Sequence, residues 1–347
     1  MLPCGTFNET YAKDLAIVRT RFQWGILIAA IVAAYCVPLF ASTYIVGLFD
    51  RILIIIVCVL GLQIVMGYCG QVSFGQAAFM AVGAYTAAIF TAKFGWNFLP
   101  AMIMAGIVTG VIGMIGGAPS LRIKGFYLAM ATLAIHFIVM WVIMHLEITE
   151  GTRGMIVPPP TLGGIVFATD QSMFYIILTV TIIMTFLAKS LARSKIGRAF
   201  IAIRDNDLAA EVMGINLFSY KLLAFFISCF YAGVAGSLWA YWLVSITPEH
   251  FTLFHAIWYV GMIIVGGMGS ITGVFFGVIF LQALDEAALI AVPALREISM
   301  FFGGAGPGIS MAVMGIIIAL FLIFEPRGLY HRWEIFKSSY RLYPFID

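Results

Sequence analysis

The feature that most constrains this chain is a series of apolar runs long enough to cross a lipid bilayer. A spanning helix needs about 20 apolar residues, because the hydrocarbon core is about 30 Å thick. Ten spans are expected, some of them short. They cover residues 24–47, 52–68, 73–91, 98–117, 125–145, 173–188, 221–243, 257–268, 271–292 and 308–324. The sequence therefore predicts an all-α polytopic membrane protein with roughly ten transmembrane helices.

Composition excludes a soluble globular domain. Hydrophobic residues make up 63% of the 347 residues and charged residues only 10%, whereas soluble domains carry about 25% charged residues. A surface facing water would need more polar side chains than this chain provides. We expect one transmembrane domain over residues 24–326, flanked by short segments at 1–23 and 327–347.

The distribution of basic residues predicts the orientation of the chain. If the N-terminus lies inside and the spans alternate, fifteen of the nineteen Lys and Arg residues fall in inner segments. Cytoplasmic segments are enriched in Lys and Arg. Both termini are therefore expected in the cytoplasm, with a cytoplasmic loop at 189–221 and an external loop at 146–172. The net charge of +3 then reflects topology and indicates no nucleic-acid partner.

Two expected spans, 52–68 and 257–268, are short and end in glycine-rich sequence. The two sequences are Gly67-Tyr-Cys-Gly70 and Gly266-Gly-Met-Gly269. Irregular backbone at membrane depth survives only where protein or a water-filled path satisfies its polar groups. We therefore expect discontinuous helices at both places.

The expected cytoplasmic loop contains the pattern of a short amphipathic helix. Asp205 or Asn206 can cap such a helix, Asp207 falls in its first turn, and Gly214 suits its end. The apolar residues of one face are Leu208, Val212 and Ile215. A charged loop that only sets topology needs none of these features. We therefore predict an element that docks on a cytoplasmic partner.

This loop resembles the coupling loop of the LivM-type permeases of branched-chain amino acid ABC importers. The matching stretch runs from Gly197 through Ala202-Ile-Arg-Asp-Asn-Asp-Leu-Ala-Ala-Glu-Val-Met-Gly-Ile-Asn216 to Phe225. Further matching segments are Gly67-Tyr-Cys-Gly-Gln-Val-Ser-Phe-Gly-Gln-Ala-Ala-Phe79, Tyr127-Leu-Ala-Met-Ala-Thr-Leu-Ala134, Gly266-Gly-Met-Gly-Ser-Ile-Thr-Gly273 and Glu325-Pro-Arg-Gly-Leu329. Together they cover roughly residues 50–330, and their joint occurrence is more specific than any single motif.

The resemblance implies a permease subunit of an ATP-driven ABC importer in the bacterial inner membrane. It also implies a second, similar permease subunit, two cytoplasmic ATPases and a periplasmic substrate-binding protein. ATP and Mg would be bound by the ATPases, and this chain has no Gly-x-x-x-x-Gly-Lys-Ser/Thr sequence of its own. The substrate would be a branched-chain or other small amino acid, with urea, short amides or small carboxylates as alternatives.

The same resemblance implies that a helix over residues 198–214 couples the permease to its ATPases. Its apolar face would supply contact area, and its charged residues would orient it. The residues expected to take part are Arg198, Arg204, Asp205, Asp207, Leu208, Glu211, Val212 and Gly214.

Polar residues inside the expected spans are candidates for a translocation path. Gln71, Ser73 and Gln76 lie beside glycines, and Thr132 and His136 lie one helical turn apart. Polar side chains within membrane helices face the protein interior or a water-filled cavity. Helix–helix packing through small residues and side-chain amides is the alternative interpretation. The family segment usually has a small residue where His136 stands.

The external stretch Thr149-Glu-Gly-Thr-Arg-Gly-Met155 is a candidate external gate or contact for the binding protein. Thr149, Thr152 and Arg153 are its candidate residues, and an ordinary solvated loop is the alternative.

An autonomous channel or secondary transporter is a rival class, but it usually needs intramembrane acids, which are almost absent from the centres of the spans. No catalytic or metal-binding motif is present, so the chain is expected to be non-catalytic, with no metal site and no cofactor.

Overall fold

The structure, a computed structural model, describes residues 21–120, 125–162, 165–167 and 169–298, with 315–316, 319–321, 323, 325 and 328–342 near the end. It is a helical bundle, as predicted. Its helices are α2 (Arg21–Phe40), α3 (Thr43–Leu62), α4 (Gln76–Ala88), α5 (Phe98–Ser120), α6 (Phe126–His145), α7 (Asp170–Arg193), α8 (Lys195–Asp205), α9 (Asp207–Val212), α10 (Leu217–Leu243), α11 (Leu253–Gly266), α12 (Ile271–Ile298) and α14 (Gly328–Leu342).

Short elements extend or connect these helices. Two π-helical turns, η1 (Gln63–Tyr68) and η2 (Ile89–Lys93), continue α3 and α4. The 3-10 turns are η3 (Glu147–Thr149), η4 (Gly151–Arg153) and η5 (Pro248–Phe251). Four two-residue strands, β1 (Met155–Ile156), β2 (Thr161–Leu162), β3 (Ile165–Val166) and β4 (Ser245–Ile246), form the antiparallel pairs β1–β4 and β2–β3.

Five helices among the described residues are long and apolar enough to cross a membrane by themselves. They are Thr43–Tyr68, Phe98–Ala118, Tyr127–His145, Asp170–Arg193 and Leu217–Leu243. A bent pair, Pro248–Gly266 with Ile271–Ala287, has an angle of 119° between its parts and has the length and composition of either a broken span or a re-entrant loop. The predicted number of ten is therefore approximate, and most of the expected span 308–324 lies outside the described residues.

The first span boundary was predicted wrongly. The sequence predicts one span that ends at residue 47 and a short one that begins at residue 52. The helix instead begins at Thr43 and runs to Tyr68. Arg51 is accommodated within it because its guanidinium forms a 3.0 Å ion pair with Asp285 on α12.

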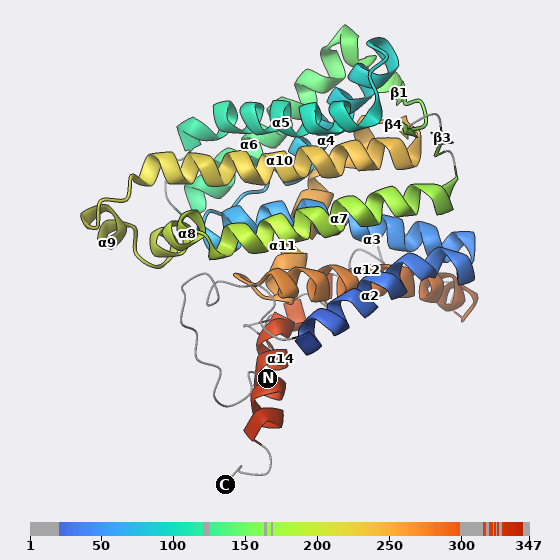
Figure 1. Cartoon of the computed structure of the whole chain (residues 1–347). Coiled ribbons are helices and arrows are strands. Elements are labelled where there is room, and N and C mark those ends of the chain that lie inside the picture. The colour runs from blue at the N-terminus through green and yellow to red at the C-terminus, as the bar shows by residue number, and fades with distance from the viewer. Residues whose placement is uncertain are drawn as a thin grey trace.

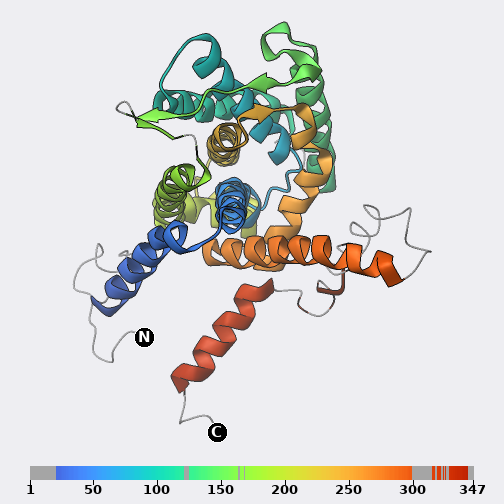
Figure 2. The same cartoon turned by 90° about the vertical axis from the view of Figure 1, so that its right-hand side faces the viewer.

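The bundle has two distinct faces at opposite ends of its helices. The axes of helices α5, α7 and α10 are nearly parallel in Figure 1, with α8 and α9 at one end and strands β1 and β4 at the other. Figure 2 shows α3, α7 and α10 nearly end-on and close together. We call the end with α8 and α9 the loop face, and the end with β1 and β4 the strand face.

Basic residues in the described part of the chain lie mainly on the loop face. Those at the end of α7 and in α8, at the start of α10 and in α14 are Lys189, Arg193, Lys195, Arg198, Arg204, Lys221, Arg332, Lys337 and Arg341. The strand face has Lys93, which pairs with Glu150 at 3.7 Å, and the exposed Arg153 in η4. The predicted orientation of the chain rests on this unequal distribution of basic residues between the two faces. The cytoplasmic location of the loop face remains a prediction.

Glycines allow the central helices to approach closely. A Cβ atom added at Gly106 on α5 would lie 2.7 Å from the ring of Phe230 on α10. One added at Gly277 on α12 would lie 1.9 Å from the carbonyl oxygen of Met262 on α11. Such contacts are typical of membrane helices, whose backbones pack through small residues. Gly106 and Gly277 therefore serve helix packing.

Candidate functional site

Two interruptions of helical structure lie in contact at the loop-face half of the bundle. Residues 69–75, here called the first break, separate η1 from α4, and residues 267–270, the second break, separate α11 from α12. The Gln63 side-chain amide of η1 donates hydrogen bonds to the carbonyl oxygens of Gly267 at 3.3 Å and Ser270 at 3.0 Å. The expected discontinuous helices are thus confirmed, and a buried amide joins them.

Gln63 was missed by the sequence analysis. The sequence feature that could have identified Gln63 is an amide side chain within a long apolar run, four residues before Gly67. A Cβ atom added at Gly67 would lie 2.8 Å from the backbone nitrogen of Gly269, so the two breaks approach through glycine backbone. Gly267 and Gly269 have φ values of 114° and 83°, a region that glycine adopts at little cost.

Thr132 on α6 holds the first break in place. Its hydroxyl accepts a hydrogen bond from the backbone nitrogen of Phe74 at 3.0 Å and donates to the Ala129 carbonyl oxygen at 2.9 Å. Thr132 is completely buried. His136, one turn farther along α6, is also buried, and its Nδ1 has no hydrogen-bond partner among the described residues. The structure therefore gives these two predicted path residues different surroundings.

Gln76 lies at a crossing of three helices. Its amide nitrogen donates to the carbonyl oxygen of Cys58 on α3 at 3.0 Å, and its amide oxygen accepts from the Ser228 hydroxyl on α10 at 3.1 Å. Of the two interpretations offered for Gln76, these contacts favour helix packing. Ser73 is buried within the first break, where its hydroxyl accepts a 3.4 Å hydrogen bond from the Gly75 nitrogen.

Gln71 differs from its neighbours because its side chain borders open space. It is buried, yet neither amide atom has a hydrogen-bond partner in the described part of the chain. A buried polar group without a partner costs about 1–3 kcal/mol. Gln71 lines a cavity of about 350 Å³ on the loop face, together with Cys69, Gly70, Gly125, Leu128, Ile203, Arg204, Asp205, Asn206, Asp207 and Lys221. The cavity thus lies between the first break and the loop that contains α8 and α9.

The predicted single helix over 198–214 is wrong, because the structure has two helices, α8 and α9. Asn206 separates them with an extended backbone, φ −159° and ψ 106°, and its side-chain oxygen accepts a 3.1 Å hydrogen bond from the Ala209 nitrogen. Of the two predicted caps, Asp205 and Asn206, the structure uses Asn206. A capping residue has non-helical backbone and therefore ends the preceding helix. Gly214 has φ 84° and follows the end of α9, as predicted.

The two helices of the loop present their apolar side chains differently. Ala199, Phe200 and Ile203 of α8 are buried. On α9, Leu208 is 67% exposed and Val212 is 87% exposed. The loop therefore has one anchored helix and one helix with an uncovered apolar surface.

Charged residues fix the loop to the bundle. Arg204 donates through Nη1 to the Gly67 carbonyl oxygen at 2.9 Å, and its Nη2 lies 2.9 Å from Asp205 Oδ1. Asp207 pairs with Lys221 of α10 at 3.7 Å. Arg204 thus joins the loop that contains α8 and α9 to Gly67, which lies two residues before the first break. The other two charged candidates, Arg198 and Glu211, are exposed.

The candidate residues at the strand face also separate into two kinds. The Thr149 hydroxyl is buried and donates to the carbonyl oxygens of Ile143 at 2.5 Å and Leu146 at 2.7 Å, so it caps the end of α6. Thr152 and Arg153 are exposed and are the two that remain available to a partner.

Comparison with known proteins connects this arrangement to a family. A family model described as a branched-chain amino acid transport system permease component matches residues 44–322. This chain belongs to that family. It is accordingly a membrane-embedded permease subunit of an ABC importer.

Several curated relatives extend the comparison. The high-affinity branched-chain amino acid transport system permease protein LivM of Salmonella typhimurium is 30% identical over 328 residues, which cover 87% of this chain and 74% of the relative. LivM of Escherichia coli matches equally well. The probable branched-chain amino acid transport permease protein LivH of Methanocaldococcus jannaschii is 27% identical over 65% of this chain and 73% of its own length. No solved structure matches.

Proposed function

We propose that this permease moves branched-chain or other small amino acids across the bacterial inner membrane as half of a heterodimer with a homologous permease. The long matches to proteins named LivM and LivH support both the substrate class and the second subunit. A permease named for autoinducer 2 import in Escherichia coli is 29% identical over only 33% of the chain. We therefore infer the substrate class from the longer matches, those to LivM and LivH.

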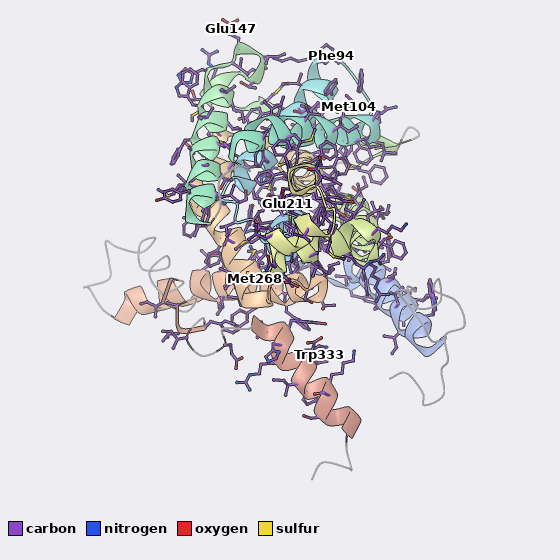
Figure 3. All side chains as sticks on the ribbon, turned by 90° about the vertical axis from the view of Figure 1, so that its left-hand side faces the viewer. Phe94, Met104, Glu147, Glu211, Met268 and Trp333 are labelled. Carbon is purple, nitrogen blue, oxygen red and sulfur yellow. The ribbon has the colours of Figure 1, made fainter. Side chains whose placement is uncertain are left out.

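Energy would come from two cytoplasmic ATPases that bind ATP and Mg and contact α9. The observation that supports this contact is that Leu208 and Val212 of α9 are exposed to solvent on the loop face. Figure 3 looks onto this face and labels Glu211, on the same short helix. Exposed apolar side chains beside charged ones are typical of a protein contact. The buried apolar residues of α8 would transmit the motion of α9 to the bundle.

The hydrogen bonds supply a route from this contact to the membrane path. Motion of α8 would act through Arg204 on Gly67, and Gln63 would pass the displacement to the second break. Gln71 borders the cavity beneath the loop and would line the inner mouth of the path. Ser73 and His136 are further path candidates.

The strand face would meet the periplasmic binding protein. Thr152 and Arg153 are exposed there and would form that contact or an external gate. An autonomous channel would need neither a binding protein nor an exposed apolar helix on the opposite face.

The coupling proposal is tested by Leu208→Asp in the reconstituted importer. A carboxylate placed in a helix-in-groove contact loses its hydration without gaining a partner, which is costly. We expect an ATPase to dissociate, or substrate-stimulated ATP hydrolysis to fall to the unstimulated level. The measurements are co-purification of the ATPases in detergent and hydrolysis with and without the binding protein.

Ile156→Asp is the matched control for co-purification. Ile156 is exposed like Leu208 but lies in β1 at the strand face, so the same change should leave the ATPases attached. Wild-type ATPase retention and stimulation in Leu208→Asp would contradict the docking role of α9.

The orientation is tested by single cysteines at two exposed positions. Lys195→Cys lies at the start of α8 and Thr152→Cys lies in η4 at the strand face. In intact cells, a membrane-impermeant thiol reagent should label Thr152→Cys and leave Lys195→Cys unlabelled until the cells are opened. The reverse pattern would overturn the proposed orientation.

A further inference from the structure

A second cavity lies on the loop face, beside the second break. It has a volume of about 680 Å³ and lies between the end of α7, the start of α12 and α14. Its lining residues are Tyr68, Thr185, Lys189, Ala192, Arg193, Gly269, Ser270, Ile271, Thr272, Phe275, Tyr330, Trp333, Glu334 and Lys337. We call it the α14 cavity.

The α14 cavity has the chemistry of an anion site. Its lining has three cations, Lys189, Arg193 and Lys337, and one acid, Glu334. Hydroxyl groups are supplied by Tyr68, Thr185, Ser270, Thr272 and Tyr330. The N-terminus of the 28-residue helix α12 also borders it. The Ser270 hydroxyl accepts a 3.2 Å hydrogen bond from the Gly273 nitrogen there, and the dipole of the helix favours an anion at this end.

An aromatic surface adjoins this charged cavity. The ring of Trp333 lies 6.0 Å from that of Phe276 and 6.0 Å from that of Phe336, measured between centroids. Trp333 is 49% exposed and Phe336 is 65% exposed. Ile279 is also exposed and lies one turn beyond Phe276 on α12, so the apolar surface extends along that helix. We call these four side chains the apolar shelf.

The orientation of α14 places the shelf where a membrane surface would be. Figure 1 shows α14 running across the direction of α7 and α10 and away from the bundle, and Figure 3 labels Trp333 on it. Aromatic residues gather at membrane interfaces, and amphipathic helices lie in the interfacial plane. Lys189 lies near the end of α7 and Arg193 lies in its last turn, where cationic side chains reach lipid headgroups.

We propose that the α14 cavity binds the headgroup of an anionic phospholipid, whose acyl chains lie over the apolar shelf. Cations, hydroxyls and the helix N-terminus would hold the phosphate, and the shelf would cover the first part of the chains. A free phosphate would use only the charged part. The continuity of the cavity with the exposed aromatic and aliphatic side chains is what favours a lipid.

The test is lipid retention by the full chain, purified in detergent and measured by native mass spectrometry. Phosphatidylglycerol should be retained at least tenfold better than phosphatidylcholine. The double variant Lys189→Gln/Lys337→Gln should bind phosphatidylglycerol about 30-fold more weakly, which corresponds to about 1 kcal/mol for each lost cation near a membrane surface.

Matched variants separate the site from general charge effects. Lys195→Gln/Arg198→Gln removes the same charge from exposed positions of the loop face outside the α14 cavity and should retain phosphatidylglycerol. Lys189→Arg/Lys337→Arg keeps the charge and should also retain it, which guards against a folding defect. Trp333→Ala should weaken phosphatidylglycerol binding without changing competition by inorganic phosphate.

Several results would overturn the proposal. These are equal retention of the two lipids, equal losses in both glutamine variants, and insensitivity of lipid binding to Trp333→Ala. Complete displacement of the lipid by millimolar inorganic phosphate would identify a simple anion site. Loss of ATPase co-purification in Lys189→Gln/Lys337→Gln with unchanged lipid binding would assign the cavity to a protein partner.

Discussion

Helices α8 and α9 are adjacent in one loop but relate to solvent in opposite ways. The 11-residue helix α8 buries Ala199, Phe200 and Ile203 against the bundle, whereas the six-residue helix α9 exposes Leu208 and Val212. Both segments have apolar residues at helical spacing. The difference shows that an amphipathic pattern identifies a surface to be covered but does not say whether the same chain or a partner covers it.

The largest expected effect is on the anchored helix. Phe200→Ala would leave a cavity where a fully buried ring contacts Tyr220 of α10, and buried Phe→Ala changes cost about 3–5 kcal/mol. We expect a lower midpoint of thermal unfolding. Leu208→Ala, on the exposed helix, should change stability by only about 0.5 kcal/mol or less. Equal shifts for the two variants would remove the distinction between anchor and docking surface.

Arg204 connects the loop that contains α8 and α9 to the bundle. Its removal should separate ATPase binding from the stimulation of ATP hydrolysis. Arg204→Ala leaves the Gly67 carbonyl oxygen without the 2.9 Å guanidinium donor, at a cost of about 1–3 kcal/mol. We expect the ATPases to remain bound while substrate-stimulated hydrolysis falls roughly tenfold, the effect of about 1.4 kcal/mol. Arg204→Lys, which keeps a positive donor, should fall between the wild type and Arg204→Ala. Full stimulation in Arg204→Ala would break the proposed connection.

The boundary between the helices is tested by Asn206→Ala. The side-chain oxygen of Asn206 accepts from the Ala209 nitrogen, and loss of such a cap costs about 1 kcal/mol. Hydrogen exchange of the Ala209 amide should therefore accelerate roughly fivefold. Asn206→Asp, which retains an acceptor, serves as the control. Unchanged exchange in Asn206→Ala would show that α9 does not depend on its cap.

The smallest effect is expected at Asp207. Asp207→Lys removes an acid from the first turn of α9, worth about 0.3–1 kcal/mol, and places a cation beside Lys221, which lies 3.7 Å from the native carboxylate. Stimulated hydrolysis should fall less than in Leu208→Asp. The exchanged pair Asp207→Lys/Lys221→Asp should recover part of the loss. No recovery would show that the ion pair does not orient α9.

Features with a local physical cause could be predicted from the sequence. The cap at Asn206, the end at Gly214 and the breaks beside Gly67 and Gly267 all follow from residue types at short spacing. The membrane bundle likewise follows from apolar runs. These features depend on neighbours within a few residues, so no knowledge of distant segments is needed.

Features that depend on distant partners could not be predicted. Arg51 appeared to mark a connection between spans because its ion-pair partner, Asp285, is 234 positions away. Gln76 and Gln71 look alike in the sequence, yet one is bonded to α3 and α10 and the other borders a cavity. Their difference arises from the packing of helices that are separate in the chain.

The hydrogen bond from Arg204 to Gly67 lies near the far end of α8, so in the proposed coupling this helix would act as a lever. Eleven residues at 1.5 Å rise give an arm of about 16 Å from the pivot at Ser194. A rotation of roughly 10° would carry the far end of such an arm about 3 Å, which is the length of a hydrogen bond. A small tilt of the loop would therefore be enough to separate Arg204 from Gly67, so the proposed coupling would depend on a contact that is either made or broken.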